Sequence, residues 1–178
     1  MSTPADVHLG QRMSWDEYTR LRDDVRAEYI DGRAVMSPSP SRRHQQAARA
    51  LADALDAALP PTHRVTLAWS WRVRRDEFVP DVMVHAHTDE DVRFTGLPVL
   101  VAEVLSTNRG DDLVRKTVKY AAAGLPHYWI LDPRDCVLDA YELVDGSYEL
   151  QARLTDGDAA DIPFGVGTAR IDLGQLLA

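Results

Sequence analysis

Three ionisable residues have types and spacing suited to metal-assisted hydrolysis. Glu103 interrupts the apolar run PVLVAEVL (98–105), and Asp81 follows Pro80 in a second apolar stretch. A carboxylate in a buried strand is strongly unfavourable unless it is paired, hydrogen-bonded or bound to a metal. If the two strands are neighbours, both carboxylates can converge on one cation, and Mg²⁺ prefers such oxygen ligands.

A helix that follows the strand of Glu103 supplies a lysine. Asp112, Lys116 and Tyr120 are spaced four residues apart, so a helix places them on one face. Lys116 can then orient or deprotonate an attacking water, or stabilise charge on a phosphate. Structural alternatives stay open for each of these residues. Glu103 can form an ion pair with Lys116 that only ties the helix to the sheet. Asp112 can stabilise the helix N-terminus through the helix dipole, and Tyr120 can be a packing residue. Lys119 falls off this face and is expected in solvent.

The elements that must position these residues alternate between strands and helices. They are a short helix over 13–24, a hairpin around Asp31-Gly32, a helix from Ser41 closed by Pro60-Pro61, strands within 63–75 and 78–86, a buried strand at 98–105, a helix at 111–123 ended by Gly124, a buried strand at 127–132, a hairpin around Asp145-Gly146, and a short strand or helical turn at 171–178. The strand-helix-strand unit from 98 to 132 predicts an α/β fold with a mixed sheet and a right-handed crossover.

The length, cysteine content and net charge limit the possible class of protein. A length of 178 residues predicts one domain over 1–178, with residues 1–12 expected to be flexible. The single Cys136 cannot form an internal disulfide, and no signal peptide or membrane-length apolar run is present, so we expect a cytoplasmic protein without membrane association. The net charge of −8 disfavours broad, sequence-independent binding of nucleic acid, although SRRHQQAAR (41–49) or WRVRR (71–75) can form a local basic surface.

Four stretches carry a resemblance to a known family. They are EYIDGRAVMSPSPSRRH (28–44), PD (80–81), AEVLS (102–106) and DLVRKTVKYAAAGLPHYWILDP (112–133). Together they resemble the Uma2 family, previously called DUF820, of restriction endonuclease-like proteins in the PD-(D/E)XK nuclease superfamily. The resemblance covers nearly the whole chain. It implies a restriction endonuclease-like core, in which a central mixed β-sheet is flanked by helices and carries metal ligands on adjacent strands, with additional β-hairpins.

The resemblance also implies roles for single residues. Asp81 takes the position of the motif aspartate and Glu103 that of the motif glutamate. Leu105 stands where the superfamily has its lysine, so Lys116 is the migrated lysine that approaches from the helix. Glu28 matches an acidic residue ahead of the first hairpin turn and can join the metal site. His44 matches a further family position and can contact a phosphate or the scissile-site water.

The sequence therefore predicts a phosphodiesterase of nuclease type that acts on DNA and depends on Mg²⁺, with Mn²⁺ as a substitute. Asp81 and Glu103, with Glu28, are the expected metal ligands, and Lys116 positions the water or stabilises developing charge. A homodimer is expected because nucleases cut two strands. Two alternatives remain: a non-catalytic module that binds nucleic acid or protein, favoured by the acidity and Leu105, and a hydrolase of small phosphodiesters, favoured by the modest basic content.

Overall fold

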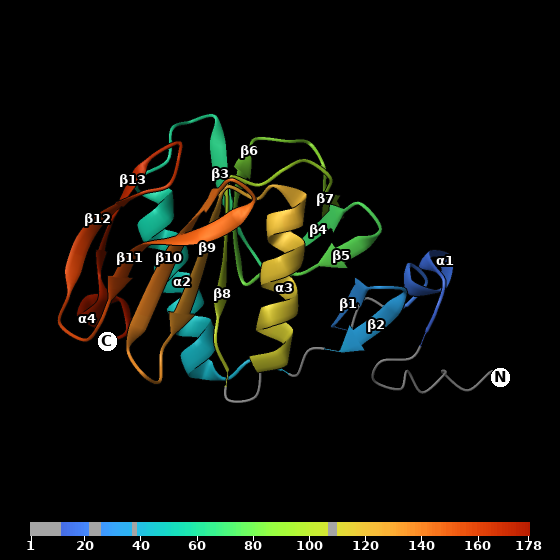
Figure 1. Ribbon diagram of the computed structural model, residues 1–178, viewed down its shortest axis with the longest axis horizontal. Helices are drawn as coiled ribbons and strands as arrows, with labels where there is room; N and C mark the ends of the chain where they lie inside the picture. Colours follow the sequence, from blue (N-terminus) through green and yellow to red (C-terminus); the bar gives the residue numbers. More distant parts are fainter. Residues whose placement is uncertain (1–11, 22–25, 37–38, 107–109) are drawn as a thin grey trace.

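The computed structural model describes residues 12–21, 26–36, 39–106 and 110–178, except the side chains of 110–112. The described residues form three β-sheets and four helices (Figure 1). The helices are α1 (Trp15–Tyr18), α2 (Arg42–Asp56), α3 (Gly110–Ala123) and α4 (Leu173–Leu176). Among the described residues, no helix has the length and apolar character needed to cross a membrane. Of the segment expected to be flexible, residues 1–11 lie outside the description, whereas Arg12 bridges to Arg33.

The largest sheet is mixed, as expected, and has the strand order β11-β10-β9-β8-β6-β3. Its strands are β3 (His63–Leu67), β6 (Val82–Ala86), β8 (Leu100–Val104), β9 (His127–Asp132), β10 (Val137–Val144) and β11 (Ser147–Leu154). β8 and β9 are parallel and are joined through α3, and the other neighbouring strands are antiparallel. This confirms the predicted strand-helix-strand unit and the α/β class.

A second sheet, of five strands, is built around the predicted N-terminal hairpin. Its order is β2-β1-β5-β4-β7, formed by β1 (Ala27–Ile30), β2 (Arg33–Met36), β4 (Ser70–Val73), β5 (Asp76–Phe78) and β7 (Arg93–Phe94). The turn between β1 and β2 places Asp31 and Gly32 at φ values of 53° and 73°, the left-handed region that the Asp-Gly pair was expected to adopt. The small third sheet pairs β12 (Ala159–Pro163) with β13 (Thr168–Asp172).

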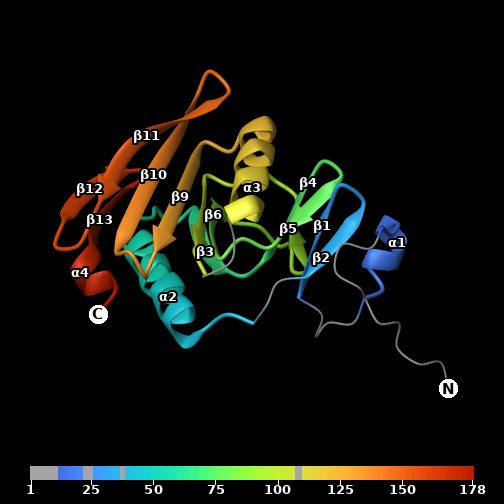
Figure 2. The same ribbon diagram turned by 60° about the horizontal axis from the view of Figure 1, so that its bottom comes forward.

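Two helices lie on opposite faces of the six-stranded sheet, and this arrangement positions the candidate site (Figures 1 and 2). α2 packs its buried alanine and leucine side chains against one face, which includes Val82, Ala102 and Trp129. The other face, with Met83 and Val101, packs against the α3 side of the molecule and meets residues of the five-stranded sheet. The end of β8 therefore has one helix on each side.

The first helix is shorter than expected. Ser14 caps α1 and forms a capping box with Glu17, but the helix ends at Tyr18. The Tyr18 hydroxyl lies 2.8 Å from the carbonyl of Ala27 and 3.0 Å from Glu77 Oε1. These contacts hold the end of α1 against β1 and β5.

Two buried histidines should make the fold sensitive to acid. Burial lowers the pKa of both His85 and His127. The unfolded chain then binds more protons as the pH falls through about 6.5, so their contribution to stability is present above that pH and is lost below it. We expect the free energy of unfolding to fall as the pH drops below about 6.5, by at most about 1.4 kcal/mol per pH unit for each histidine.

Urea unfolding at pH 7.5, 6.0 and 5.0 measures this effect. His127→Leu should show a shallower decline than the unsubstituted protein, because one protonation site is removed. An equal decline in both proteins would contradict the prediction.

Candidate active site

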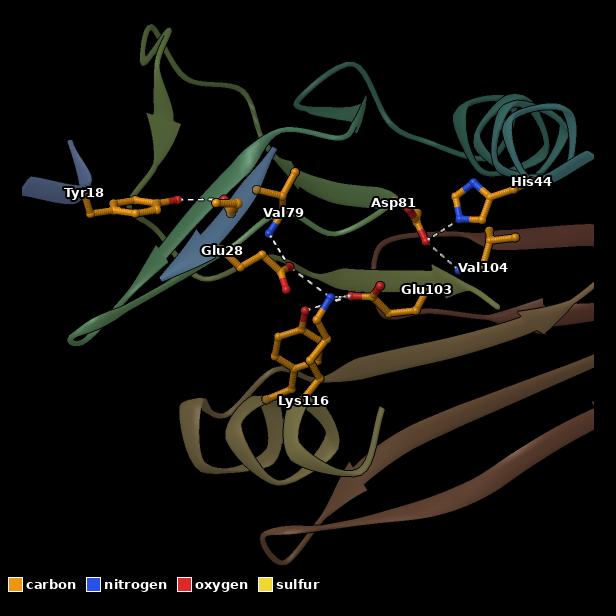
Figure 3. A network of polar contacts seen from close by, with 10 residues as sticks. Tyr18, Glu28, His44, Val79, Asp81, Glu103, Val104 and Lys116 are labelled. Atoms are coloured by element: carbon orange, nitrogen blue, oxygen red, sulfur yellow. Dashed lines mark hydrogen bonds and ion pairs between the residues drawn. The ribbon is translucent and has the colours of Figure 1, made fainter. Parts of the chain in front are cut away.

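The two carboxylates singled out from the sequence reach the same end of adjacent strands. β6 and β8 pair antiparallel, with Val82 opposite Ala102. Asp81 comes directly before β6, one residue outside the strand in which it was expected, and Glu103 directly follows Ala102 in β8. Each carboxylate thus belongs to the residue next to the pair formed by Val82 and Ala102. Figure 3 shows both at this edge of the sheet.

Glu103 shares a lysine with a second buried carboxylate. Lys116 Nζ lies 3.1 Å from Glu103 Oε1 and 2.9 Å from Glu28 Oε1. Tyr120, one turn further along α3, donates its hydroxyl to the same Glu103 oxygen at 2.9 Å. The side chains of Glu28, Glu103 and Lys116 are 2%, 4% and 3% exposed. The three charges come from β1, β8 and α3, so the cluster joins both large sheets through one helix (Figure 3).

The electrostatics of Glu103 reflect this enclosed position. Burial raises the pKa of Glu103 to about 7; Lys116 and the Tyr120 hydroxyl act to lower it, and the charges of Asp81 and Glu28 raise it further. Burial and the Glu103 charge also raise the pKa of Tyr120 well above its ordinary value, so its hydroxyl stays protonated and acts as a donor.

Asp81 is held from the opposite face of the sheet. Its Oδ2 accepts the backbone N–H of Val104 at 2.8 Å and lies 3.1 Å from His44 Nε2. His44 is on the first turn of α2, whose N-cap residue Ser41 accepts the His44 backbone N–H. Each strand carboxylate is therefore held by a different helix: Asp81 by α2 and Glu103 by α3 (Figure 3).

Comparison with known proteins identifies the family of the chain. A family model, Uma2, described as "Putative restriction endonuclease", matches residues 15–173. The chain belongs to the Uma2 family. A crystal structure described as "a putative nuclease belonging to DUF820 from Anabaena variabilis ATCC 29413" superposes with a TM-score of 0.73 at 18% identity, covering 91% of this chain and 96% of that chain. At that identity the likeness concerns the fold, and it supports the restriction endonuclease-like class. No curated protein matches the chain.

Most of the residues predicted for the candidate site come together in two groups. Lys116 contacts Glu28 and Glu103, and His44 contacts Asp81. Asp112 belongs to α3, but its side chain lies outside the described residues. The two halves of the site meet where β8 ends.

The prediction for Lys119 was wrong. Its Nζ lies 2.7 Å from both Asp31 Oδ1 and Asp76 Oδ2, and its side chain is only 22% exposed. The reason is tertiary: the β1–β2 turn and the start of β5 bring two carboxylates to the side of α3 that the helical pattern alone left in solvent. Lys119 therefore ties α3 to the five-stranded sheet.

Two backbone donors were missed by the sequence reasoning. Val104 N–H binds Asp81 Oδ2, and Val79 N–H binds Glu28 Oε1 at 2.8 Å. Residue type gives no signal for either, because every residue except proline carries the same donor. These two donors can be identified only from the strand register and from the packing of the two large sheets against each other.

The donor chemistry of the candidate site fits a hard divalent cation. Of the contacts made by described residues, none engages Asp81 Oδ1 or Glu103 Oε2, so each carboxylate keeps one oxygen for a further ligand. Mg²⁺ is commonly held by one or two carboxylates together with water and substrate phosphate. No group of three or more His, Cys, Asp or Glu side chains within the described part of the chain is arranged for a metal. The residues therefore fit a cation held by two carboxylates, with water and substrate as the remaining ligands.

Proposed function

We propose that this Uma2 protein is a metal-dependent nuclease that hydrolyses phosphodiester bonds in DNA, with Asp81, Glu103 and Lys116 as its catalytic residues. The observation that carries the proposal is the placement of Asp81 and Glu103 at the same end of two adjacent strands, with Lys116 Nζ 3.1 Å from Glu103. The family description and the nuclease description of the similar crystal structure support the same class of reaction.

Asp81 and Glu103 are the residues that would hold the cation. A bound Mg²⁺ would lower the pKa of a coordinated water and polarise the scissile phosphate. In the hydrolysis, the water oxygen forms a bond to phosphorus, the bond from phosphorus to the leaving oxygen breaks, and that oxygen gains a proton. The products are a phosphate monoester and an alcohol.

Lys116 would act on the charge that develops on the phosphate. Lys116 Nζ is fixed beside Glu103 by its ion pairs with Glu28 and Glu103. A positive charge fixed at this place can stabilise charge on a phosphate oxygen without reorganising. Tyr120 keeps Glu103 oriented through its hydroxyl.

Glu28 is proposed to serve the site through Lys116 and, as a further carboxylate, to contribute to the charge that attracts the cation. Its Oε1 already accepts the Val79 N–H and the lysine. A homodimer remains part of the proposal, because two cuts in a duplex need two sites. A hydrolase of small phosphodiesters is the second candidate, and the net charge of −8 favours it, since such a substrate requires fewer basic contacts.

Cleavage assays test the proposal and separate its substrates. Purified protein is incubated with double-stranded DNA, single-stranded DNA, RNA and a chromogenic phosphodiester, in Mg²⁺, in Mn²⁺ and in EDTA. We expect cleavage of DNA with either metal and none in EDTA. Cleavage of the chromogenic ester alone would favour the second candidate.

The control for these assays is the double variant Asp81→Asn and Glu103→Gln, purified in parallel. Its two amides retain hydrogen-bonding capacity but lack the charges proposed to bind metal. Cleavage by this variant at the rate of the unsubstituted protein would assign the activity to other residues or to a contaminant.

A further inference from the structure

The first turn of α2 has a feature that the proposed reaction does not use. We propose that His44 is a positioning residue, whose imidazole fixes the carboxylate of Asp81 so that its second oxygen is presented to the divalent cation. The inference rests on the proposed function, because it concerns the metal site of that reaction. It gives His44 a role different from the expected contact with phosphate or water.

Both contacts to Asp81 engage the same oxygen. Val104 N–H donates to Oδ2 from the end of β8, and His44 Nε2 reaches Oδ2 from α2 at 3.1 Å. One hydrogen bond alone leaves a carboxylate able to rotate about its last torsion, which is broad for aspartate. Two donors from different elements restrict that rotation, and Oδ1 is left for another ligand.

The imidazole is buried at the capped start of α2. His44 is 7% exposed, and its backbone N–H is bound by the hydroxyl of the N-cap residue Ser41 at 3.2 Å. The next turn of α2 buries Ala47 and Ala48 against the sheet. A helix start that is fixed by a cap and by the packing of its next turn places the buried ring at a defined position against the carboxylate it contacts.

The other ring nitrogen identifies which tautomer does this. His44 Nδ1 is buried and has no hydrogen-bond partner among the described residues. A proton on Nδ1 would leave a buried donor unsatisfied, which is unfavourable, whereas a bare nitrogen at that position loses less. The neutral ring therefore carries its proton on Nε2 and donates it to Asp81.

The positions of the two ring nitrogens argue against direct contact with substrate. A general base must reach the proton it removes within hydrogen-bond distance. Nε2 is committed to Asp81 and Nδ1 is enclosed, so neither nitrogen faces a bound phosphate or water. His44 thus acts through Asp81, in the way that partners of metal-binding side chains orient their ligands.

Three substitutions at one position test the role. His44→Gln places an amide N–H near the position of Nε2, His44→Asn places it one bond short, and His44→Ala removes the donor. Binding of Mn²⁺ is measured by titration calorimetry, independently of cleavage. Loss of such an orienting partner typically weakens metal binding about 10- to 100-fold, and we expect this loss for His44→Ala and His44→Asn. We expect His44→Gln to bind within about 3-fold of the unsubstituted protein, since it restores the donor.

Gln45→Ala is the matched control, because Gln45 is the exposed neighbour on the same turn. It should bind Mn²⁺ normally. Urea unfolding of each variant shows whether it is folded at the assay temperature. Where cleavage is measured, weakened metal binding should raise the Mn²⁺ concentration needed for half-maximal rate and leave the rate at saturating metal less affected.

The outcomes separate this inference from the proposed function. Weakened Mn²⁺ binding in the alanine and asparagine variants, with recovery in the glutamine variant, supports it even if no nucleic acid is cleaved. Cleavage by the unsubstituted protein together with normal Mn²⁺ affinity of folded His44→Ala overturns the inference and leaves the nuclease assignment standing. Absence of both Mn²⁺ binding and cleavage in the unsubstituted protein overturns both.

Discussion

Replacing Lys116 with methionine is expected to lower the free energy of unfolding by about 3–5 kcal/mol, the usual range when one partner of a buried ion pair is removed. The lysine is the cation shared by Glu28 and Glu103, at 2.9 and 3.1 Å, and both carboxylates are almost fully buried. Without it, one or both must keep a proton to remain inside. A raised carboxyl pKa gives stability that is lost as the pH rises, so the loss should be larger at pH 8 than at pH 6.

Urea unfolding followed by tryptophan fluorescence measures this effect. The control combines Lys116→Met with Glu28→Gln and Glu103→Gln, which removes all three charges and should recover most of the stability, because no buried charge is left unpaired. If Lys116→Met alone were as stable as the unsubstituted protein at pH 8, the ion-paired cluster would not exist in solution.

Glu103→Gln is expected to reduce the rate of DNA cleavage by at least about 100-fold, a typical loss when an electrostatic contact to the transition state is removed. The variant should remain folded, because Lys116 keeps Glu28 as its partner and the glutamine carbonyl can accept the Tyr120 hydroxyl. Loss of activity without loss of stability separates a catalytic Glu103 from one that only ties α3 to the sheet. Rates are measured under single-turnover conditions in Mg²⁺, at equal concentrations of folded protein.

The chain supplies a closely matched control in Glu77. This carboxylate is 3% exposed, and it too accepts one hydroxyl, from Tyr18, and one cationic side chain, Arg93, at 2.8 Å. It lies in β5 of the five-stranded sheet. Glu77→Gln should cleave DNA at the normal rate per folded molecule. Equal loss of activity in both variants would mean that glutamate burial in general, and not position 103, supports the reaction.

Local pattern predicted the α/β fold and much of the site. A glutamate within an uninterrupted apolar run is costly to bury, so Glu103 was identifiable from strand composition alone. The Asp31-Gly32 turn was identifiable from its backbone requirements, and the four-residue spacing of Lys116 and Tyr120 from helical geometry. All three are properties of short stretches of chain.

What escaped prediction depends on where distant segments meet. Lys119 looked solvent-exposed because its partners, Asp31 and Asp76, lie 88 and 43 residues away in sequence. The Glu28–Lys116 pair has the same origin, since no local pattern shows that β1 stands opposite α3. The resemblance to Uma2 marked Glu28 and His44 as site residues, but only the fold shows that one holds a lysine and the other an aspartate.

The origin of Glu28 in a different sheet from Glu103 has a consequence during synthesis of the chain. β1 is made early and α3 much later, so the lysine gains its second carboxylate only when the two sheets have docked. A partly folded chain contains the residues of the candidate site but does not yet hold them together. For the nuclease proposed above, cleavage would then require completed tertiary assembly.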